Sequence, residues 1–282
     1  MDIRASLFAN PYGPFFFTIQ GLSVVYSGSE NFSGDETITS AVVSDDVSDL
    51  SAKVDAGLKI GVFYNCLNLE SVELPTSLRT IGIKAFSGCK LLECLIPSGV
   101  VELGDHCFSG CRLLNTVDLP PGLKTIGYCA FSNCKSLENV NFHELKVLRS
   151  LGARAFFGCS ALTRIELKSQ LLKAIETHAF DGCEGLKKLY LPSSVEAIES
   201  DAFLNCRSLS VVVPYNVKRE VHETLKRAQV VVVDRPRWPQ WKSELGAIFY
   251  KDEAIKVGLV VGEDLSTNEF DDNMRERGAF EG

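Results

Sequence analysis

The chain has 282 residues, of which 45% are hydrophobic, so it is long enough and apolar enough for one elongated domain or two compact ones. Its formal net charge of −7 disfavours phosphate backbones and anionic bilayers as general partners. We therefore expect no nucleic-acid partner and no membrane insertion, and no window approaches the run of about 18 apolar residues that a spanning helix needs.

Residues 1–57 predict a β-rich N-terminal cap, because strand-like LSVVY and TITSAVV runs alternate with turns rich in Gly, Ser and Asp. The apolar run at residues 15–19 is shorter than the core of a signal peptide and follows Pro11 and Pro14. A cytoplasmic location is therefore the default expectation. Asn31-Phe32-Ser33 matches a glycosylation acceptor, which matters only if the chain enters the secretory route.

A repeated unit fills residues 58–216 and resembles Ile-Gly-x-x-Ala-Phe-x-x-Cys-x-x-Leu-x-x-Val-x-Leu-Pro. Two of its copies read IGIKAFSGCKLLECLIP and LGARAFFGCSALTRIEL. The cysteine marks the register in seven copies: Cys66, Cys89, Cys111, Cys134, Cys159, Cys183 and Cys206. Successive cysteines are separated by 22 to 25 residues, which is the length of a leucine-rich repeat.

Each unit predicts one strand and a return arm. The strands fall at residues 72–74, 117–119, 140–142 and 165–167, and their outward alternates are expected to form a concave sheet face. The return arm carries an Ala-Phe pair whose phenylalanines are expected to stack as an internal ladder: Phe86, Phe108, Phe131, Phe156, Phe180 and Phe203. The glycines that open the arm are interpreted as positions with unusual backbone angles: Gly82, Gly104, Gly127 and Gly152.

The C-terminal quarter of the chain divides into two parts. Residues 217–234 predict a helix and strand that cap the array, because a stacked repeat needs its open end covered. Residues 235–282 form a C-terminal extension that is expected to be partly flexible. In this extension Trp238 and Trp241 either form an interface hot spot or cover the last coil.

The repeat resembles the BspA-like class of leucine-rich repeats over about 160 of the 282 residues. This resemblance implies an α/β-type repeat solenoid, a right-handed leucine-rich-repeat solenoid of about seven BspA-like repeats with N- and C-terminal caps. It also implies an adhesin or an interaction module without enzymatic activity, since members of the class are known from bacterial surfaces and from protists. Surface members usually carry a secretion signal, and none is recognisable here.

The outward strand positions are the candidate partner-binding residues, because a stacked solenoid presents them as one extended surface. They are Glu70, Glu73, Glu93, Asp118, Glu138, Asn141, Arg164, Glu166, Lys187, Lys188 and Tyr190. The order runs from acidic to basic, which is suited to orienting a protein partner. The alternatives are a solvated face without a partner, a cell-surface adhesin that recognises host or matrix protein or glycan, and an unrecognised enzyme.

The cysteines and histidines carry no recognisable chemistry. No C-x-x-C pair exists, so no metal site is predicted, and the seven cysteines in register are interpreted as small apolar residues packed at the repeat turn. His106 and His178 are interpreted as exposed loop residues. No catalytic residue, metal or cofactor is expected, and the chain is predicted to be a monomer or a weak dimer.

Overall fold

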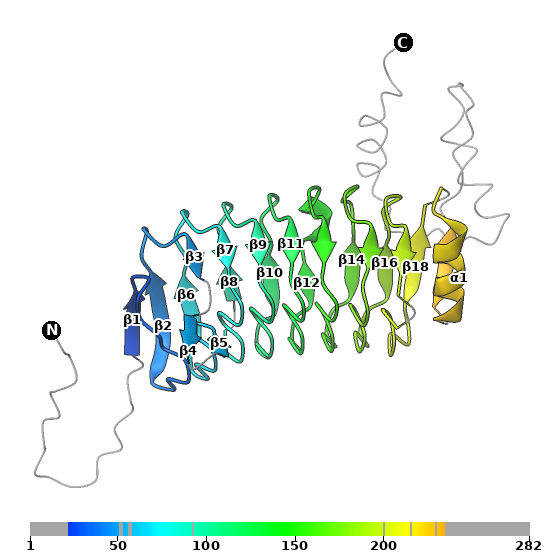
Figure 1. Ribbon diagram of the computed structural model, residues 1–282. Helices are drawn as coiled ribbons and strands as arrows, with labels where there is room; N and C mark the ends of the chain where they lie inside the picture. The colour runs from blue at the N-terminus through cyan, green and yellow to red at the C-terminus, as the bar shows by residue number, and fades with distance from the viewer. Residues whose placement is uncertain are drawn as a thin grey trace, which may run out of the picture. The chain divides into compact units, whose positions relative to one another are not determined.

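The computed structural model describes residues 22–50, 53–55, 58–91, 93–199, 201–214, 216–228 and 230–234. Within these residues the chain coils into a parallel β-solenoid in which successive coils stack on one another (Figure 1). Each complete coil contributes one strand to a wide sheet, one two-residue strand to a narrow sheet, and a run of turns on the third side. The predicted repeat solenoid is confirmed.

The wide sheet carries the predicted strands, and each begins about one residue earlier than predicted. Neighbouring strands pair in parallel, with matched residues such as Val117 and Val140 in register. Its strands are β1 (Leu22–Tyr26), β2 (Ile38–Val43), β6 (Ser71–Glu73), β8 (Glu93–Leu95), β10 (Thr116–Asp118), β12 (Asn139–Val140), β14 (Arg164–Glu166), β16 (Lys188–Tyr190), β18 (Ser210–Val213) and β19 (Val231–Asp234).

The narrow sheet was not predicted. Its strands are β3 (Asp49–Leu50), β7 (Thr80–Ile81), β9 (Glu102–Leu103), β11 (Thr125–Ile126), β13 (Ser150–Leu151), β15 (Ala174–Ile175) and β17 (Ala197–Ile198). Each strand has one buried Leu or Ile that points into the core. Beside the wide sheet, β4 (Lys53–Asp55) and β5 (Leu58–Ile60) form a separate antiparallel pair.

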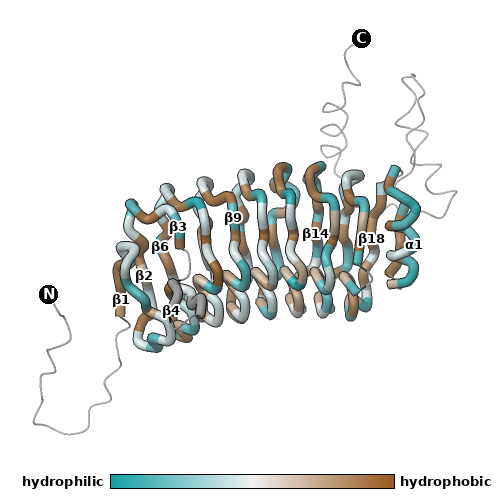
Figure 2. Tube along the Cα trace, in the orientation of Figure 1, coloured by the Kyte–Doolittle hydropathy of each residue, from teal (hydrophilic) through white to brown (hydrophobic). Residues whose placement is uncertain are grey.

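The phenylalanine ladder predicted for the interior is confirmed. Consecutive rings from Phe63 to Phe203 stack with centroids 5.1 to 5.9 Å apart and planes within 15° of parallel. Phe32 extends the ladder towards the N-terminus by stacking on Phe63 at 5.6 Å. Apolar residues recur at matching places in successive coils (Figure 2), so burying the ladder holds neighbouring coils together.

A third set of backbone hydrogen bonds joins the coils on the turn side. The Phe86 N–H donates to the Cys107 carbonyl and the Gly88 N–H to the Ser109 carbonyl, both at 2.8 Å, and later coils repeat the pattern. This ladder needs a left-handed residue just before each repeat cysteine, and glycine or asparagine meets that need. The residues are Asn65, Gly88, Gly110, Asn133, Gly158, Gly182 and Asn205.

The interpretation of the arm-opening glycines was wrong. None of Gly82, Gly104, Gly127 and Gly152 has a positive φ. A Cβ on Gly127 would instead lie 2.7 Å from the carbonyl carbon of Gly104, and one on Gly152 equally close to that of Gly127. These glycines are needed because the backbones of successive coils approach one another closely here.

The two ends of the described chain continue the same stacking. β1 pairs with β2 and β2 with β6, so parallel coil stacking begins before residue 58, where the repeat motif becomes readable. At the other end α1 (Arg219–Arg227) buries Val221 and Leu225 against the last coils. β19 then pairs with β18 as the last strand of the wide sheet.

Strand pairing in the wide sheet is interrupted twice, between β6 and β8 and between β12 and β14. We call the second interruption, where the narrow sheet is interrupted as well, between β13 and β15, the joint. On the turn side the bonds continue, as in Phe156 N–H to the Ala179 carbonyl at 2.9 Å. A short 3-10 helix, η1 (Phe142–Glu144), replaces the Leu-Pro strand end here, which makes this the longest repeat.

Candidate interaction surface

The outward side chains of the wide sheet form two rows that run along the solenoid, because alternate residues of a strand face opposite sides. One row consists of Ser71, Thr116, Asn139, Arg164, Lys188 and Ser210. The other consists of Glu73, Leu95, Asp118, Asn141, Glu166, Tyr190 and Val212. Strand pairing sets the rows in register from β8 to β12 and again from β14 to β18. We call this surface the wide-sheet face.

All eleven predicted site residues belong to this face or border it. Six of them lie within strands of the wide sheet: Glu73, Asp118, Arg164, Glu166, Lys188 and Tyr190. Glu93 is the first residue of β8. Glu70, Glu138 and Lys187 stand just before β6, β12 and β16, and Asn141 follows β12 directly. The sequence therefore located the outward face of the wide sheet.

The charge of the face changes at the joint. Exposed carboxylates precede it at Glu73, Asp118 and Glu138. Exposed cations follow it at Arg164, Lys187 and Lys188. Glu70 contributes less free charge than the sequence implies, because Lys90 binds its carboxylate at 2.7 Å. The polarity is thus centred on the irregular coil.

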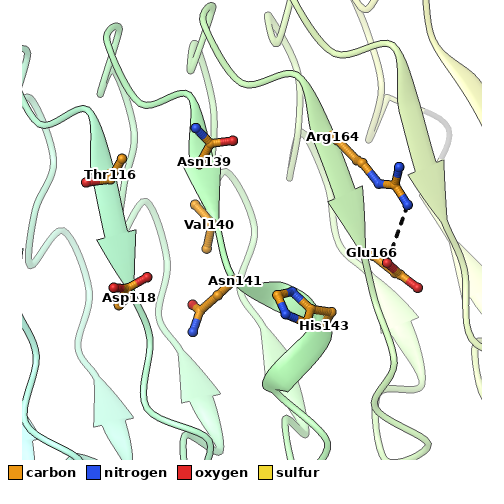
Figure 3. A pocket seen from close by; sticks show the side chains of 8 residues that line it. All are labelled: Thr116, Asp118, Asn139, Val140, Asn141, His143, Arg164 and Glu166. Carbon is orange, nitrogen blue, oxygen red and sulfur yellow. Dashed lines mark ion pairs between the residues drawn. The ribbon is translucent and has the colours of Figure 1, made fainter. Parts of the chain in front are cut away.

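A solvent-open depression of about 420 Å³ lies at this change of charge (Figure 3). Asp118 lines one side and Arg164 the other, while Asn139 and His143 lie between them. Sequence reasoning missed His143, which η1 brings to the face. The 25-residue spacing from Cys134 to Cys159 was the available signal that this coil departs from the repeat.

Arg164 is held in position at its side of the depression. Its guanidinium lies 3.6 Å from the Glu166 carboxylate and 4.9 Å from the ring centroid of Tyr190. Lys168 also approaches Glu166, at 3.5 Å. The Arg164 side chain is therefore pre-organised, which reduces the conformational entropy lost when an anionic group binds it.

Asn141 has a structural role instead. Its Oδ1 accepts from the Leu119 N–H at 2.7 Å, and its Nδ2 donates to the Leu119 carbonyl at 3.0 Å and to Glu144 at 3.2 Å. In a regular coil, a backbone carbonyl of the next coil accepts the hydrogen bond that Asn141 Oδ1 accepts here. The Tyr190 carbonyl, for example, accepts from the Leu167 N–H. The amide thus substitutes for the strand that η1 interrupts.

The seven repeat cysteines are buried, which confirms their assignment to the core. Each thiol contacts the phenylalanine carbonyl of the preceding coil at 3.0 to 3.2 Å, as Cys134 Sγ does with Phe108. Burial raises the pKa values of Cys134, Cys159 and Cys183 well above the ordinary thiol value. The thiols are therefore protonated donors at neutral pH.

The interpretation of His106 and His178 as exposed was wrong. Both are half-buried on the turn side with positive φ. His106 packs edge-on against Tyr128, and burial lowers its pKa. His178 lies between two carboxylates, with Nδ1 2.9 Å from Asp181 and Nε2 3.1 Å from Asp201. Packing of successive turns against one another covers residues that a single repeat would leave open.

None of the helices in the described part of the chain is long and apolar enough to cross a membrane, and the same residues contain no group of three His, Cys, Asp or Glu side chains that could hold a metal ion. Trp238 and Trp241 lie outside the described residues.

Comparison with known proteins assigns the repeat. A family model described as a BspA type leucine rich repeat region matches in six copies over residues 58–171 and 145–224, more than half of the chain. No curated protein matches. A leucine rich repeat protein of T. pallidum is similar in structure, with 25% sequence identity, a TM-score of 0.53, and coverage of 69% of this chain and 85% of that one.

The comparison with solved structures also found a second protein. It is a leucine rich cell surface protein from Faecalibacterium prausnitzii A2-165, 22% identical, with a TM-score of 0.42 and coverage of 74% of this chain and 63% of that one. Proteins built from such repeats are typically interaction or surface proteins without catalytic activity. The sequence motif, the family model and the stacked coils agree, and the chain belongs to the BspA-type leucine-rich repeat family.

Proposed function

We propose that this protein is a non-catalytic interaction module that binds a protein partner on its wide-sheet face. The observation that carries the proposal is the reversal of charge across the depression at the joint, from Asp118 and Glu138 to Arg164 and Lys188. Such a bipolar surface favours one orientation of a partner with complementary charges and speeds its encounter.

Contact area for this partner is available beside the charges. Tyr190 is half-buried under Arg164, and Leu95 stands out from β8 with 76% of its surface exposed. Aromatic and Arg side chains supply most of the energy in many protein interfaces. The depression itself offers the Asn139 amide and the His143 imidazole as hydrogen-bonding groups.

The experiment is affinity capture from native extract with a wide-sheet variant, Glu73→Lys, Asp118→Lys, Arg164→Glu and Lys188→Glu. Its matched control reverses two exposed cations away from the face, Lys124→Glu and Arg149→Glu. A partner that the parent and the control retain, and that the folded wide-sheet variant loses, supports the proposal. Equal capture by all three proteins would move the binding site off this face.

A further inference from the structure

We infer that the part of the wide-sheet face before the joint binds an extended segment of the partner in which basic and apolar side chains alternate. This inference rests on the proposed function, because it names the chemistry of the partner segment that lies on this face. It starts from the second outward row, which strand pairing extends to the N-terminal coils. Val25 of β1 pairs with Val42 of β2, and Val42 pairs with Glu73 of β6.

The row continues from β6 to β8, although these two strands are not paired. They lie side by side (Figure 1). Counted back two residues from the proline that follows each strand end, Glu73, Leu95 and Asp118 occupy the same position. Pairing of β8 with β10 then sets Leu95 opposite Asp118. We call the resulting line of five side chains the N-terminal row: Val25, Val42, Glu73, Leu95 and Asp118.

Three members of the N-terminal row are apolar and exposed to solvent. Leu95 has 76% of its surface exposed, Val25 62% and Val42 36%. After the joint the same row holds Glu166 and Tyr190, which are half-buried. Exposed apolar side chains that line up on one face, with polar residues beside them, are typical of an interaction surface. Burying these three side chains under a partner removes their apolar surface from water.

The other two members of the N-terminal row are exposed carboxylates, Glu73 and Asp118. Lys90, a cation at the border of the face, is bound to Glu70 at 2.7 Å. The row therefore attracts cationic groups and repels anionic ones. A partner that covers the apolar side chains must bring basic side chains with them, because carboxylates buried without a cation are costly.

The spacing along the row fits an extended chain. Strands that lie side by side are about 4.8 Å apart, so the five strands span about 19 Å. Side chains on one side of an extended segment recur about every 6.7 Å, so seven residues present four of them over about 20 Å. The first apolar side chain then lies over Val25 and Val42, and a basic one lies near Glu73. The second apolar side chain lies near Leu95, and the second basic one near Asp118.

The neighbouring outward row supplies groups that can bind the backbone of such a segment. Its members before the joint include Ser23, Ser40, Ser71 and Thr116, on β1, β2, β6 and β10. A hydroxyl group both donates and accepts hydrogen bonds. These side chains therefore suit the exposed N–H and C=O groups of an extended chain that lies along the N-terminal row.

The test uses a synthetic peptide, acetyl-Leu-Thr-Lys-Thr-Leu-Thr-Lys-amide, and the methyl NMR spectrum of the full chain labelled at Val and Leu. The peptide should shift the methyl signals of Val25, Val42 and Leu95 with a dissociation constant below about 1 mM. The signals of Val147 and Leu171 should stay in place, because these two exposed apolar residues lie outside the wide sheet.

Two further peptides separate the effect of charge from the effect of spacing. A peptide with both lysines replaced by glutamate should bind at least about tenfold more weakly, because the carboxylates of the row repel it. A peptide of the original composition in block order, Lys-Lys-Thr-Thr-Thr-Leu-Leu, should also bind more weakly, because its basic and apolar side chains cannot all reach their places. Phosphatidylcholine vesicles should shift none of these signals.

Two variants test the two kinds of contact in the row. Leu95→Ser should weaken peptide binding at least about fivefold, because it removes the most exposed of the apolar contacts. Leu171→Ser is its matched control and should bind as the parent does. Glu73→Gln with Asp118→Asn should weaken binding and reduce its dependence on salt. Circular dichroism confirms that every variant is folded.

Three results would overturn the inference: no response of the three methyl signals at about 5 mM peptide, equal binding of the glutamate peptide, or the same shifts with vesicles, which would identify a lipid surface as the occupant. The capture experiment separates this inference from the proposed function. A partner that the wide-sheet variant loses, in a protein that does not respond to the peptide, leaves the proposed function standing and removes only the basic and apolar segment. Equal capture by parent, control and wide-sheet variant would instead remove the proposed function.

Discussion

Each repeat cysteine donates its thiol proton to a carbonyl that already accepts a backbone hydrogen bond. The Phe108 carbonyl accepts from the Cys111 N–H at 3.2 Å within its own coil and from Cys134 Sγ at 3.1 Å in the next. A small apolar side chain with one donor suits this position, which alanine could fill only in part. Burial raises the pKa of Cys66 to about 11 and that of Cys206 to about 12.

These raised pKa values predict a steep loss of stability in alkali. Five of these thiols have a higher pKa in the folded chain than in the unfolded chain, where it is near 9.0: Cys66, Cys134, Cys159, Cys183 and Cys206. The stabilisation is therefore complete below that pH and is lost as the pH rises towards the folded value, because the unfolded chain releases protons that the folded chain keeps. Urea unfolding between about pH 8 and pH 10.5 measures it.

The control for this prediction removes two of the thiols, with Cys134→Val and Cys159→Val in one protein. The slope of unfolding free energy against pH should become shallower by about 1.4 kcal/mol per pH unit for each thiol removed, once the unfolded thiols are ionised. An unchanged slope would contradict the assignment of the alkaline transition to these groups.

The glycines that open the return arm predict a second effect at this scale. Gly127→Ala should lower the free energy of unfolding by about 2 to 3 kcal/mol, because the added Cβ meets the backbone of the preceding coil. Gly122→Ala is the matched control, since its Cβ would lie 4.0 Å from the Ser98 carbonyl. Denaturant unfolding compares the two, and equal stabilities would remove the close-approach explanation.

The sequence pattern identified the structurally important residues of each repeat more reliably than it identified the structural role of each. The phenylalanines and cysteines recur with apolar neighbours, so their burial could be predicted from spacing. The reason for Gly127 could not, because its neighbour Gly104 is distant in sequence and becomes close only when coils stack. The Gly or Asn that precedes each repeat cysteine, such as Gly88 and Asn133, was an available signal of left-handed backbone that sequence reasoning missed, since these two residue types tolerate it best.

At the scale of elements, long strands and the helix could be predicted but the narrow sheet could not. The strands of the wide sheet alternate inward and outward residues, and α1 has an amphipathic pattern over residues 217–229. A strand such as Thr125–Ile126 is too short to show any periodicity. It exists because the neighbouring coils offer paired backbone on both sides.

The candidate site could be predicted as far as the alternation of inward and outward strand residues reaches, but not where it depends on pairing between coils. Outward alternation located the wide-sheet face, including Asp118 and Arg164. The same alternation also predicted Asn141 as a binding residue of that face. The structure instead shows the Asn141 amide bound to the Leu119 backbone, because η1 interrupts the strand there. The joint depends on pairing that fails between coils, which no single repeat reveals.

Asn141 provides the prediction for this element. Asn141→Asp should lower the free energy of unfolding by about 1 to 3 kcal/mol, because a carboxylate cannot donate to the Leu119 carbonyl and lies near Glu144. Asn139→Asp is the control, since it adds the same charge to an exposed side chain of β12. If the two variants unfold alike in denaturant, the amide does not substitute for the missing strand.

At the scale of the whole molecule, the contacts that stabilise the stack and the proposed binding surface lie on different sides of the coil. The ladders of Phe63 to Phe203 and the turn-side hydrogen bonds hold the stack together, and neither needs the outward side chains of the wide sheet. Apart from Asn141, which binds the Leu119 backbone, those side chains can therefore vary while the repeat motif preserves the fold. Substitutions on the face should consequently change binding more than folding.

Hydrogen exchange read by mass spectrometry, with and without the captured partner, tests the central claim most directly because it locates the contact without any substitution. Peptides that contain β10, η1 and β14 should exchange more slowly in the complex, whereas turn-side peptides around Phe131 and Phe180 should keep the rate of the free protein. Protection confined to the turn side or to the narrow sheet would contradict the claim that the wide-sheet face is the binding surface.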